Sequence, residues 1–353
     1  MEATSNIAAL LAREIPGFSI DEAGRSFVEL GLDSFALIEL RIAIEYAVGA
    51  PIPDAVWIEL ETPAQIMARF CVAPTVAPPK NPAASLRRSY MLNMPQMALG
   101  GLSESWLFKE LGDAHWSLIT GGLGAPSRAL HDGCGDRLYA TFTRIRVEAS
   151  APLSRFEENE HLELEGCIRR FGAGMFFSEF ALAGTAKMIR GSVMSSFTKR
   201  GSPTSNSSLL KGQPAIPAAC PIPALAEMPE FGLGYRKRRS ALPEPALFEM
   251  EYNIIPYYDI NGVGLLYFAA YPTISDICEL KYMGRANEWA LEASTISRDV
   301  FYFANSDVSD RLVWRVHAKD KAADGVTIES SISRVSDGVL MAYLVTRKAI
   351  THD

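Results

Sequence analysis

The sequence predicts an α+β protein with a small all-α unit followed by a larger unit of antiparallel strands and two central helices. Three observations support this prediction. Acidic residues are concentrated in the first 72 positions, a stretch rich in Pro and Ala follows them, and a pattern of one apolar helix and several strands then occurs twice. The length of 353 residues corresponds to about two or three domains as a prior.

The composition excludes several classes of protein. Hydrophobic residues make up 48% of the chain and charged residues 21%, which is ordinary for a folded, soluble protein. No apolar run approaches the roughly 18 residues of a membrane span, and the polar start does not resemble a signal peptide. The five cysteines are scattered without metal-ligand spacing, so we expect no disulfide framework and no metal site. A cytoplasmic location is expected.

The charge is distributed unevenly along the chain. Residues 1–72 hold four basic and eleven acidic side chains, which accounts for the whole net charge of −7. An acidic unit of this kind is suited to basic partner surfaces and not to nucleic acid. The Pro- and Ala-rich residues 73–88 are expected to form an extended linker to a larger unit at 89–353. Residues 201–223, rich in Ser, Pro and Gly, are expected to form an internal loop.

The small unit carries clear helix signals. Apolar residues share one stripe over residues 5–14, a second helix is expected over 33–44, and Thr62-Pro63 is a good start for a last helix. Three or four short helices in about 70 residues predict a small four-helix bundle.

One motif in this unit points to a chemical function. An apolar loop ends in Gly31-Leu32-Asp33-Ser34, and the serine opens the second helix. Residues 1–72 resemble the acyl carrier and peptidyl carrier protein family, although Phe35 replaces the usual Leu or Met. The resemblance implies that a phosphopantetheinyl transferase attaches 4′-phosphopantetheine covalently to Ser34, next to Asp33. A helix N-terminus suits a phosphodiester, because its free N–H groups and dipole favour an anion; Asp33 or Ser34 could equally be a simple N-cap.

The larger unit shows two rounds of a similar pattern. The first has a helix capped by Ser103 and running to Leu118, and the second has a helical stretch over 265–271 after the glycine-rich loop 262–264. Strands are expected at 137–148, 162–170, 175–183, 187–198, 248–255, 296–304, 310–318, 326–335 and 339–350. A helix wrapped by an antiparallel sheet, given twice, is the double hot-dog architecture.

Specific strings in this unit carry a second resemblance. They are Met94–Met97, Gly100–Leu107, Lys109–Trp116, Arg137–Phe142, Ser205–Leu209 and Asn261–Phe268. These strings resemble the family of the leinamycin-type bifunctional acyltransferase/decarboxylase. The resemblance implies a double hot-dog enzyme of polyketide-type biosynthesis that takes a malonyl or methylmalonyl group from coenzyme A. The enzyme would decarboxylate this group and leave an acetyl or propionyl thioester on the phosphopantetheine of a carrier protein.

Decarboxylation of such a thioester requires stabilisation of an enolate oxygen, and not a metal. Backbone N–H groups of the glycine-rich turns at Gly101 and at 262–264 could supply this, as could the side chains of Ser103, Asn206 and Asn261. The alternative for the glycines is close packing, and for the three polar residues capping or turn formation.

Tyr139 is the residue expected at the centre of the site. The resembling family has a tyrosine implicated at its active site, and Tyr139 is the best match by position, on the strand after the first helix. It could be a nucleophile that carries the acyl group or a hydrogen-bond donor to the enolate, and the sequence leaves both open. A structural tyrosine at the edge of the core is the simpler alternative.

Two other functions compete with this one. A hot-dog thioesterase or dehydratase would need an acid or base near a helix, for which Glu104 and Asp259 are the candidates. A non-catalytic protein that only docks an acyl carrier would need neither. In every case we expect other biosynthetic synthase domains as partners, and neither nucleic acid nor a membrane.

Overall fold

The computed structural model describes residues 7, 10–15, 17–48, 52, 54–70, 84–99, 101–202, 205–235, 238, 245–285, 293–322 and 325–350. The chain divides into two compact units, Met1–Ala77 and Pro78–Asp353. The predicted linker positions 73–83 and Gly100 lie outside the described residues, as does the start of the first expected helix. No helix in the described ranges is long and apolar enough to cross a membrane.

The small unit is built from short helices around one apolar cluster. Residues 10–14 are helical, and α2 (Ser34–Val48), α3 (Asp54–Trp57) and α4 (Pro63–Phe70) follow, with a 3-10 turn at Ile20–Glu22. Leu11, Ile44 and Ile66 are fully buried in the cluster. Thr62 Oγ1 accepts a hydrogen bond from Gln65 N at 3.3 Å, while Gln65 Oε1 accepts one from Thr62 N at 3.1 Å. This reciprocal pair begins α4 where the sequence predicts a helix.

The larger unit has one long antiparallel sheet of twelve strands in its described part, of which β9 alone pairs in parallel. The strands are β1 (Ser85–Met91), β4 (Tyr139–Ala149), β5 (His161–Phe171), β6 (Met175–Ala183), β7 (Met188–Ser202), β8 (Ser205–Gly212), β9 (Ala224–Leu225), β10 (Phe248–Asn253), β11 (Ala293–Tyr302), β12 (Arg311–Ala322), β13 (Gly325–Arg334) and β14 (Leu340–Ile350). A separate small pair joins β2 (Met97–Ala98) to β3 (Gly101–Leu102).

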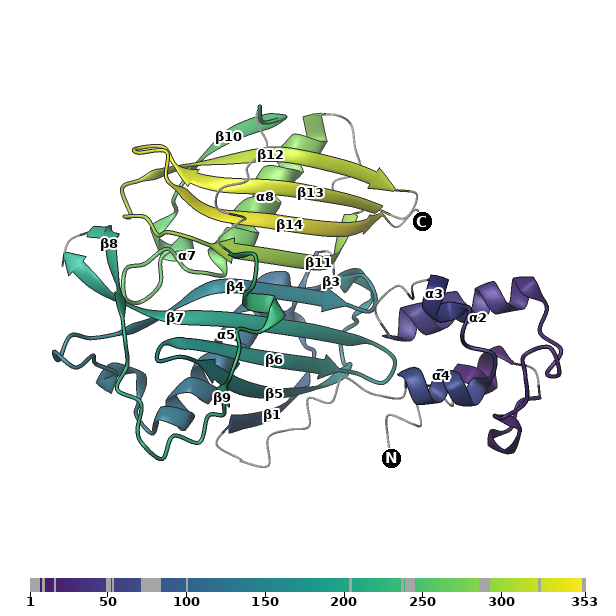
Figure 1. Ribbon diagram of the computed structural model, residues 1–353. Helices are drawn as coiled ribbons and strands as arrows, with labels where there is room; N and C mark the ends of the chain where they lie inside the picture. The colour runs from purple at the N-terminus through teal and green to yellow at the C-terminus, as the bar shows by residue number, and fades with distance from the viewer. Residues whose placement is uncertain are drawn as a thin grey trace. The chain divides into compact units, whose positions relative to one another are not determined.

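The strand order of this sheet repeats itself. One half runs β1-β5-β6-β7-β4 and the other runs β10-β12-β13-β14-β11, with β4 and β11 paired at the centre. Each half has its long helix between its first two strands in sequence: α5 (Glu104–Leu123) follows β1, and α8 (Ala270–Arg285) follows β10 and the short α7 (Pro256–Asp259). Both long helices lie on the same side of the sheet (Figure 1), and one continuous core fills the space between. The result is a hot-dog-like fold.

Three expectations from the sequence are wrong in detail. Residues 85–88, expected in the linker, belong to β1, which pairs with β5. The expected loop 201–223 contains β8, whose serine-rich sequence hides the alternation of a strand but which pairs with an extension of β7. The second helix begins at Ala270 and not at 265, because residues 261–269 form a turn closed by an Ile260–Leu266 bridge.

Candidate active site

The larger unit contains a cavity of about 1730 Å³. Its walls come from α5, from β4, β7 and β8, from the turn over residues 261–268, and from the end of β11. Both halves of the repeated sheet therefore contribute to it. The volume exceeds the roughly 300–1000 Å³ of common small-molecule sites, so a long substrate such as a pantetheine thioester has room.

Tyr139 lines this cavity at the start of β4. The guanidinium of Arg137 lies 5.0 Å from the centre of its ring, and that of Arg200 lies 5.9 Å away. Across the sheet Tyr139 is paired with Thr198 of β7. Its hydroxyl makes no hydrogen bond to any described residue. A partly exposed phenol without an internal partner is available to a ligand.

Tyr267 is a second available hydroxyl in the cavity, and the sequence reasoning missed it. Burial, and to a lesser degree the charge of Asp113, raises the pKa of Tyr267 above its ordinary value. By contrast, Tyr271 and Tyr302 also line the cavity but donate to the carbonyl oxygens of Ala304 and Phe268, each at 3.1 Å. Tyr267 lies inside one of the family-like strings, and its place directly after the glycine-rich turn was the signal that could have identified it.

Asn261 and Asn206 line the cavity, but their side chains are already hydrogen-bonded to other groups of the protein. Asn261 Oδ1 accepts hydrogen bonds from the N–H groups of Val263 and Leu265, each at 3.0 Å, and so builds the turn. Gly264 N donates to Asn261 O at 2.9 Å. Of the backbone amides expected to hold an enolate oxygen at 262–264, those of Val263 and Gly264 are therefore used within the turn, and Gly264, with φ +82°, allows its shape.

Asn206 holds the wall from the other side. Its amide Nδ2 donates to Gly264 O at 2.5 Å and to Ser306 O at 3.0 Å, while Arg200 donates to its Oδ1 at 3.3 Å. The side chain is 7% exposed. Through these hydrogen bonds Asn206 joins β8 to the turn over residues 261–268.

Gly101 and Ser103 do not line the cavity. Gly101 has φ +99°, and a Cβ there would lie 2.3 Å from the carbonyl oxygen of Leu153, so the position requires glycine for packing. Ser103 is the N-cap of α5, and its hydroxyl accepts from Trp106 N at 3.2 Å. Gly101 therefore serves close packing and Ser103 serves helix capping, the alternatives named for them from the sequence.

Asp259 and Glu104, the acids considered for a thioesterase or dehydratase, do not line the cavity either. Asp259 Oδ2 accepts from the Tyr252 hydroxyl at 3.0 Å and from Ile255 N at 2.7 Å, and the residue is buried. Glu104 forms an ion pair with Arg298, which is completely buried. Burial raises the pKa of Glu104, and the charge of Arg298 opposes this.

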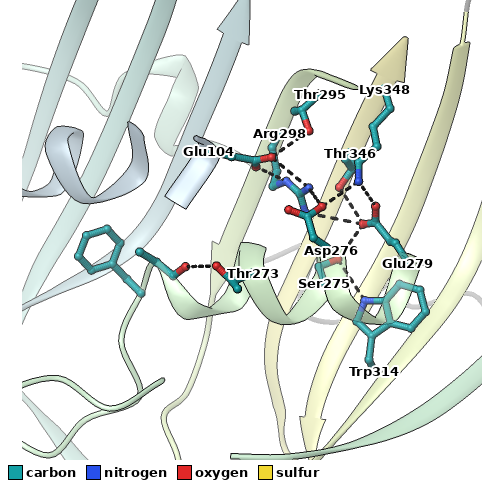
Figure 2. Close-up of polar contacts among 12 residues, drawn as sticks. Glu104, Thr273, Ser275, Asp276, Glu279, Thr295, Arg298, Trp314, Thr346 and Lys348 are labelled. Carbon is teal, nitrogen blue, oxygen red and sulfur yellow. Dashed lines mark hydrogen bonds and ion pairs between the residues drawn. The ribbon is translucent and has the colours of Figure 1, made fainter. Parts of the chain in front are cut away.

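Glu104 and Arg298 belong to a charge network that joins the two halves (Figure 2). Arg298 Nη2 lies 2.6 Å from Asp276 Oδ1, and Lys348 Nζ lies 2.8 Å from both Asp276 and Glu279. Against the opposing effect of burial, Arg298 and Lys348 lower the pKa of Asp276. The network lies over β11, β14 and α8. In the repeated order of the sheet these elements correspond to β4, β7 and α5 of the first half, which line the cavity. The second half therefore has paired charges on the elements that correspond to cavity walls in the first half.

Few groups in the cavity can act as an acid or base. Among the described residues that line it, Asp113 supplies the one carboxylate, and no histidine or glutamate is present. Asp113 is ion-paired with Arg88 at 2.8 Å. His115, on the same helix, is fully buried with its ring nitrogens 2.7 Å from Ser178 Oγ and Ser195 Oγ. Burial lowers the pKa of His115 to about 3, so it stays neutral and packs α5 against β6 and β7.

Candidate metal ligands do not gather anywhere in the described ranges, where no group of three or more His, Cys, Asp or Glu side chains has the geometry of a metal site. Apart from the Asp113 carboxylate, the polar groups of the described lining are hydroxyls, amides and cations.

In the small unit, α2 begins at Ser34 and Asp33 caps it. Asp33 Oδ1 accepts from Ala36 N at 2.8 Å, and Asp33 itself is exposed. Ile38, one turn further along α2, is an exposed apolar side chain with 55% of its surface accessible. A serine at the first position of a helix, beside an exposed capping aspartate, fits a residue that carries a phosphodiester-linked arm.

Comparison with known proteins agrees with the division of the chain into a small and a larger unit. Residues 6–70 match the family described as phosphopantetheine attachment site. No match was found among curated protein sequences. A solved structure described as an oleoyl thioesterase from Lactobacillus plantarum is similar with a TM-score of 0.55 and 11% identity, over 76% of this chain and 96% of that chain. The 12:0-ACP thioesterase from Umbellularia californica is similar with a TM-score of 0.50 and 11% identity, over 76% and 94%.

At this level of identity the structural likeness concerns the fold alone. Residues 6–70 therefore form a phosphopantetheine-binding carrier domain, and the chain continues into a unit with the hot-dog-like fold of acyl-thioesterase structures.

Proposed function

We propose that this protein is a carrier-fused acyltransferase/decarboxylase of polyketide-type biosynthesis. It takes a malonyl or methylmalonyl group from coenzyme A, removes carbon dioxide, and leaves an acetyl or propionyl thioester on a carrier phosphopantetheine. The arm is attached to Ser34, and its terminal thiol supplies the acceptor. The larger unit, with its two halves as two hot-dog units, supplies the cavity for the reaction.

The observation that carries this proposal is the set of groups around the cavity. Dehydration needs a histidine with an acid across the site, and thioester hydrolysis needs an acid or base to activate water. The described lining offers Asp113, already paired with Arg88, and otherwise hydroxyls, amides and cations. Decarboxylation needs no base to begin, because the carboxylate already carries the electron pair.

In the proposed reaction, decarboxylation comes first and acyl transfer follows. The bond between the α-carbon and the carboxylate breaks, carbon dioxide leaves, and the electron pair moves through the α-carbon to the thioester oxygen. The hydroxyl of Tyr139 donates a hydrogen bond to that oxygen and stabilises the enolate. The α-carbon then takes a proton from water. The sulfur of the arm attacks the thioester carbonyl carbon, the bond from that carbon to the coenzyme A sulfur breaks, and the coenzyme A sulfur leaves with the proton that the arm thiol gives up. We assign Tyr139 the role of donor, since no described carboxylate or histidine contacts its hydroxyl to activate it as a nucleophile.

A thioesterase is the second candidate, and the specific observation in its favour is the fold shared with acyl-thioesterase structures. Such an enzyme would release a free acid from the carrier. Glu104 and Asp259 are engaged in structural contacts, so an activated water would depend on Asp113. Detection of free acid distinguishes the two functions.

Replacement of Ser34 by alanine tests the carrier part of the proposal. We expect Ser34→Ala to abolish attachment of phosphopantetheine and, with it, every acyl group retained on the protein. Intact-mass spectrometry after incubation with a phosphopantetheinyl transferase and methylmalonyl coenzyme A measures both.

Ser19→Ala, at an exposed serine elsewhere in the small unit, is the matched control and should be modified normally. Phosphopantetheine on the Ser34→Ala protein would contradict the assignment. An acyl group retained without the arm would show a covalent enzyme intermediate, and its location on the Tyr139 oxygen would remove the donor role from that residue.

A further inference from the structure

Two cationic side chains, Arg137 and Lys211, line the same part of the cavity as Tyr139. Arg137 and Lys211 both line the cavity and are exposed, and the guanidinium of Arg137 covers the Tyr139 ring. Lys211 of β8 is paired with Thr198 of β7, which is paired with Tyr139 of β4. Directly paired residues on neighbouring strands place their side chains on the same face of a sheet. Tyr139, Thr198 and Lys211 therefore form one row, with Arg137 above its end.

These two cations are not neutralised by the described part of the protein. Neither Arg137 nor Lys211 forms an ion pair with a described carboxylate. Their neighbours differ in this respect: Lys199 lies 2.7 Å from both Asp132 and Asp136, so its charge is balanced. The end of the cavity beside Tyr139 is thus positively charged and open to an anion.

The position of the cations decides which anion of the substrate they meet. A malonyl-type coenzyme A thioester has phosphates at one end of the pantetheine chain and a free carboxylate next to the reacting carbonyl. In the proposed function the Tyr139 hydroxyl contacts that carbonyl oxygen. Arg137, over the Tyr139 ring, and Lys211, in the same row of the sheet, are then on the side of the carboxylate, and the phosphates lie a pantetheine length away.

We infer that Arg137 and Lys211 form a binding site for the free carboxylate of a malonyl-type thioester, and so select such substrates over simple acyl thioesters. The inference rests on the proposed function, because Tyr139 fixes where the reacting carbonyl lies. Arg137 offers paired N–H donors that match a carboxylate, and Lys211 adds a point charge.

The kinetic consequence differs from that of a catalytic residue. The carboxylate loses its charge as carbon dioxide leaves, so the cations bind the ground state at least as strongly as the transition state. Loss of such binding raises KM and does not lower kcat. A charged hydrogen bond at an exposed site corresponds to about a tenfold effect.

The test uses Arg137→Gln and Lys211→Gln in the phosphopantetheinylated protein. Methylmalonyl coenzyme A is the substrate, and isobutyryl coenzyme A, in which a methyl group replaces the carboxylate, is a competitive inhibitor with the same phosphates. We expect each variant to raise KM for methylmalonyl coenzyme A about tenfold, with kcat not reduced and the inhibition constant of isobutyryl coenzyme A unchanged. Lys109→Gln, at an exposed lysine of α5 outside the cavity, should change neither constant.

Each other outcome overturns the inference. Equal weakening of both ligands would place a phosphate and not the carboxylate at these cations, and unchanged constants would show that they bind no part of the substrate. A fall in kcat with constant KM would make them transition-state groups. If the wild-type protein releases no carbon dioxide, the proposed function fails, and calorimetric dissociation constants of the same two ligands then test the carboxylate site separately.

Discussion

Replacement of Tyr139 by phenylalanine is expected to lower kcat for carbon dioxide release on the order of 10²–10³-fold, the usual effect of removing one donor to a developing oxyanion. The substitution removes one oxygen and leaves the ring under Arg137 in place. Substrate binding should therefore persist, and KM should change little. Steady-state release of carbon dioxide from methylmalonyl coenzyme A measures both constants.

Tyr257→Phe is the matched control for this experiment. Tyr257 is 97% exposed on α7 and does not line the cavity, so turnover should remain at the wild-type level. Near-wild-type turnover of Tyr139→Phe would remove Tyr139 from the reaction and leave Tyr267 as the candidate tyrosine among the described residues that line the cavity.

The second large effect is expected on stability, from the charge network of Figure 2. Arg298→Met should lower the free energy of unfolding by about 3–5 kcal/mol, because it leaves the buried carboxylate of Glu104 without its counter-charge. The Glu104 side chain is 10% exposed and pairs with Arg298, whereas Asp276 and Glu279 each keep Lys348 at 2.8 Å. Urea denaturation followed by tryptophan fluorescence measures the change.

Two comparisons make this result specific. Arg311→Met breaks an exposed pair with Glu251 in the same unit and should cost less than about 1 kcal/mol. The double variant Arg298→Met/Glu104→Leu removes a charge of each sign and should recover part of the lost stability. Equal stability of Arg298→Met and Arg311→Met would show that the network does not hold the two halves together.

Much of the fold could be predicted because its signals are local. The charge asymmetry marks the small unit, and apolar and aromatic residues mark strands such as β6, whose bounds were expected as they are. β8 escaped prediction because its first four residues, Ser205–Ser208, are all polar and show no alternation, and its pairing with β7 makes it a strand. Start positions such as Ala270 of α8 depend on a turn that tertiary contacts close.

The candidate site was predictable only in part, for physical reasons. Gly101 resembles an oxyanion glycine in sequence, but the same residue type is required where a backbone approaches Leu153 closely. Asn206 and Asn261 line the cavity, yet the Asn206 side chain donates to a backbone carbonyl of another segment and the Asn261 side chain accepts from backbone N–H groups of its own turn. The network around Arg298 brings together residues from distant parts of the chain, and no local pattern indicates such a contact.

The proposed function requires that the protein decarboxylate a malonyl-type thioester and keep the product on its arm. Intact-mass spectrometry of the phosphopantetheinylated protein after incubation with methylmalonyl coenzyme A tests this claim most directly. We predict a gain equal to one propionyl group, which Ser34→Ala does not show. A gain equal to a methylmalonyl group, or release of free acid without any gain, would contradict it.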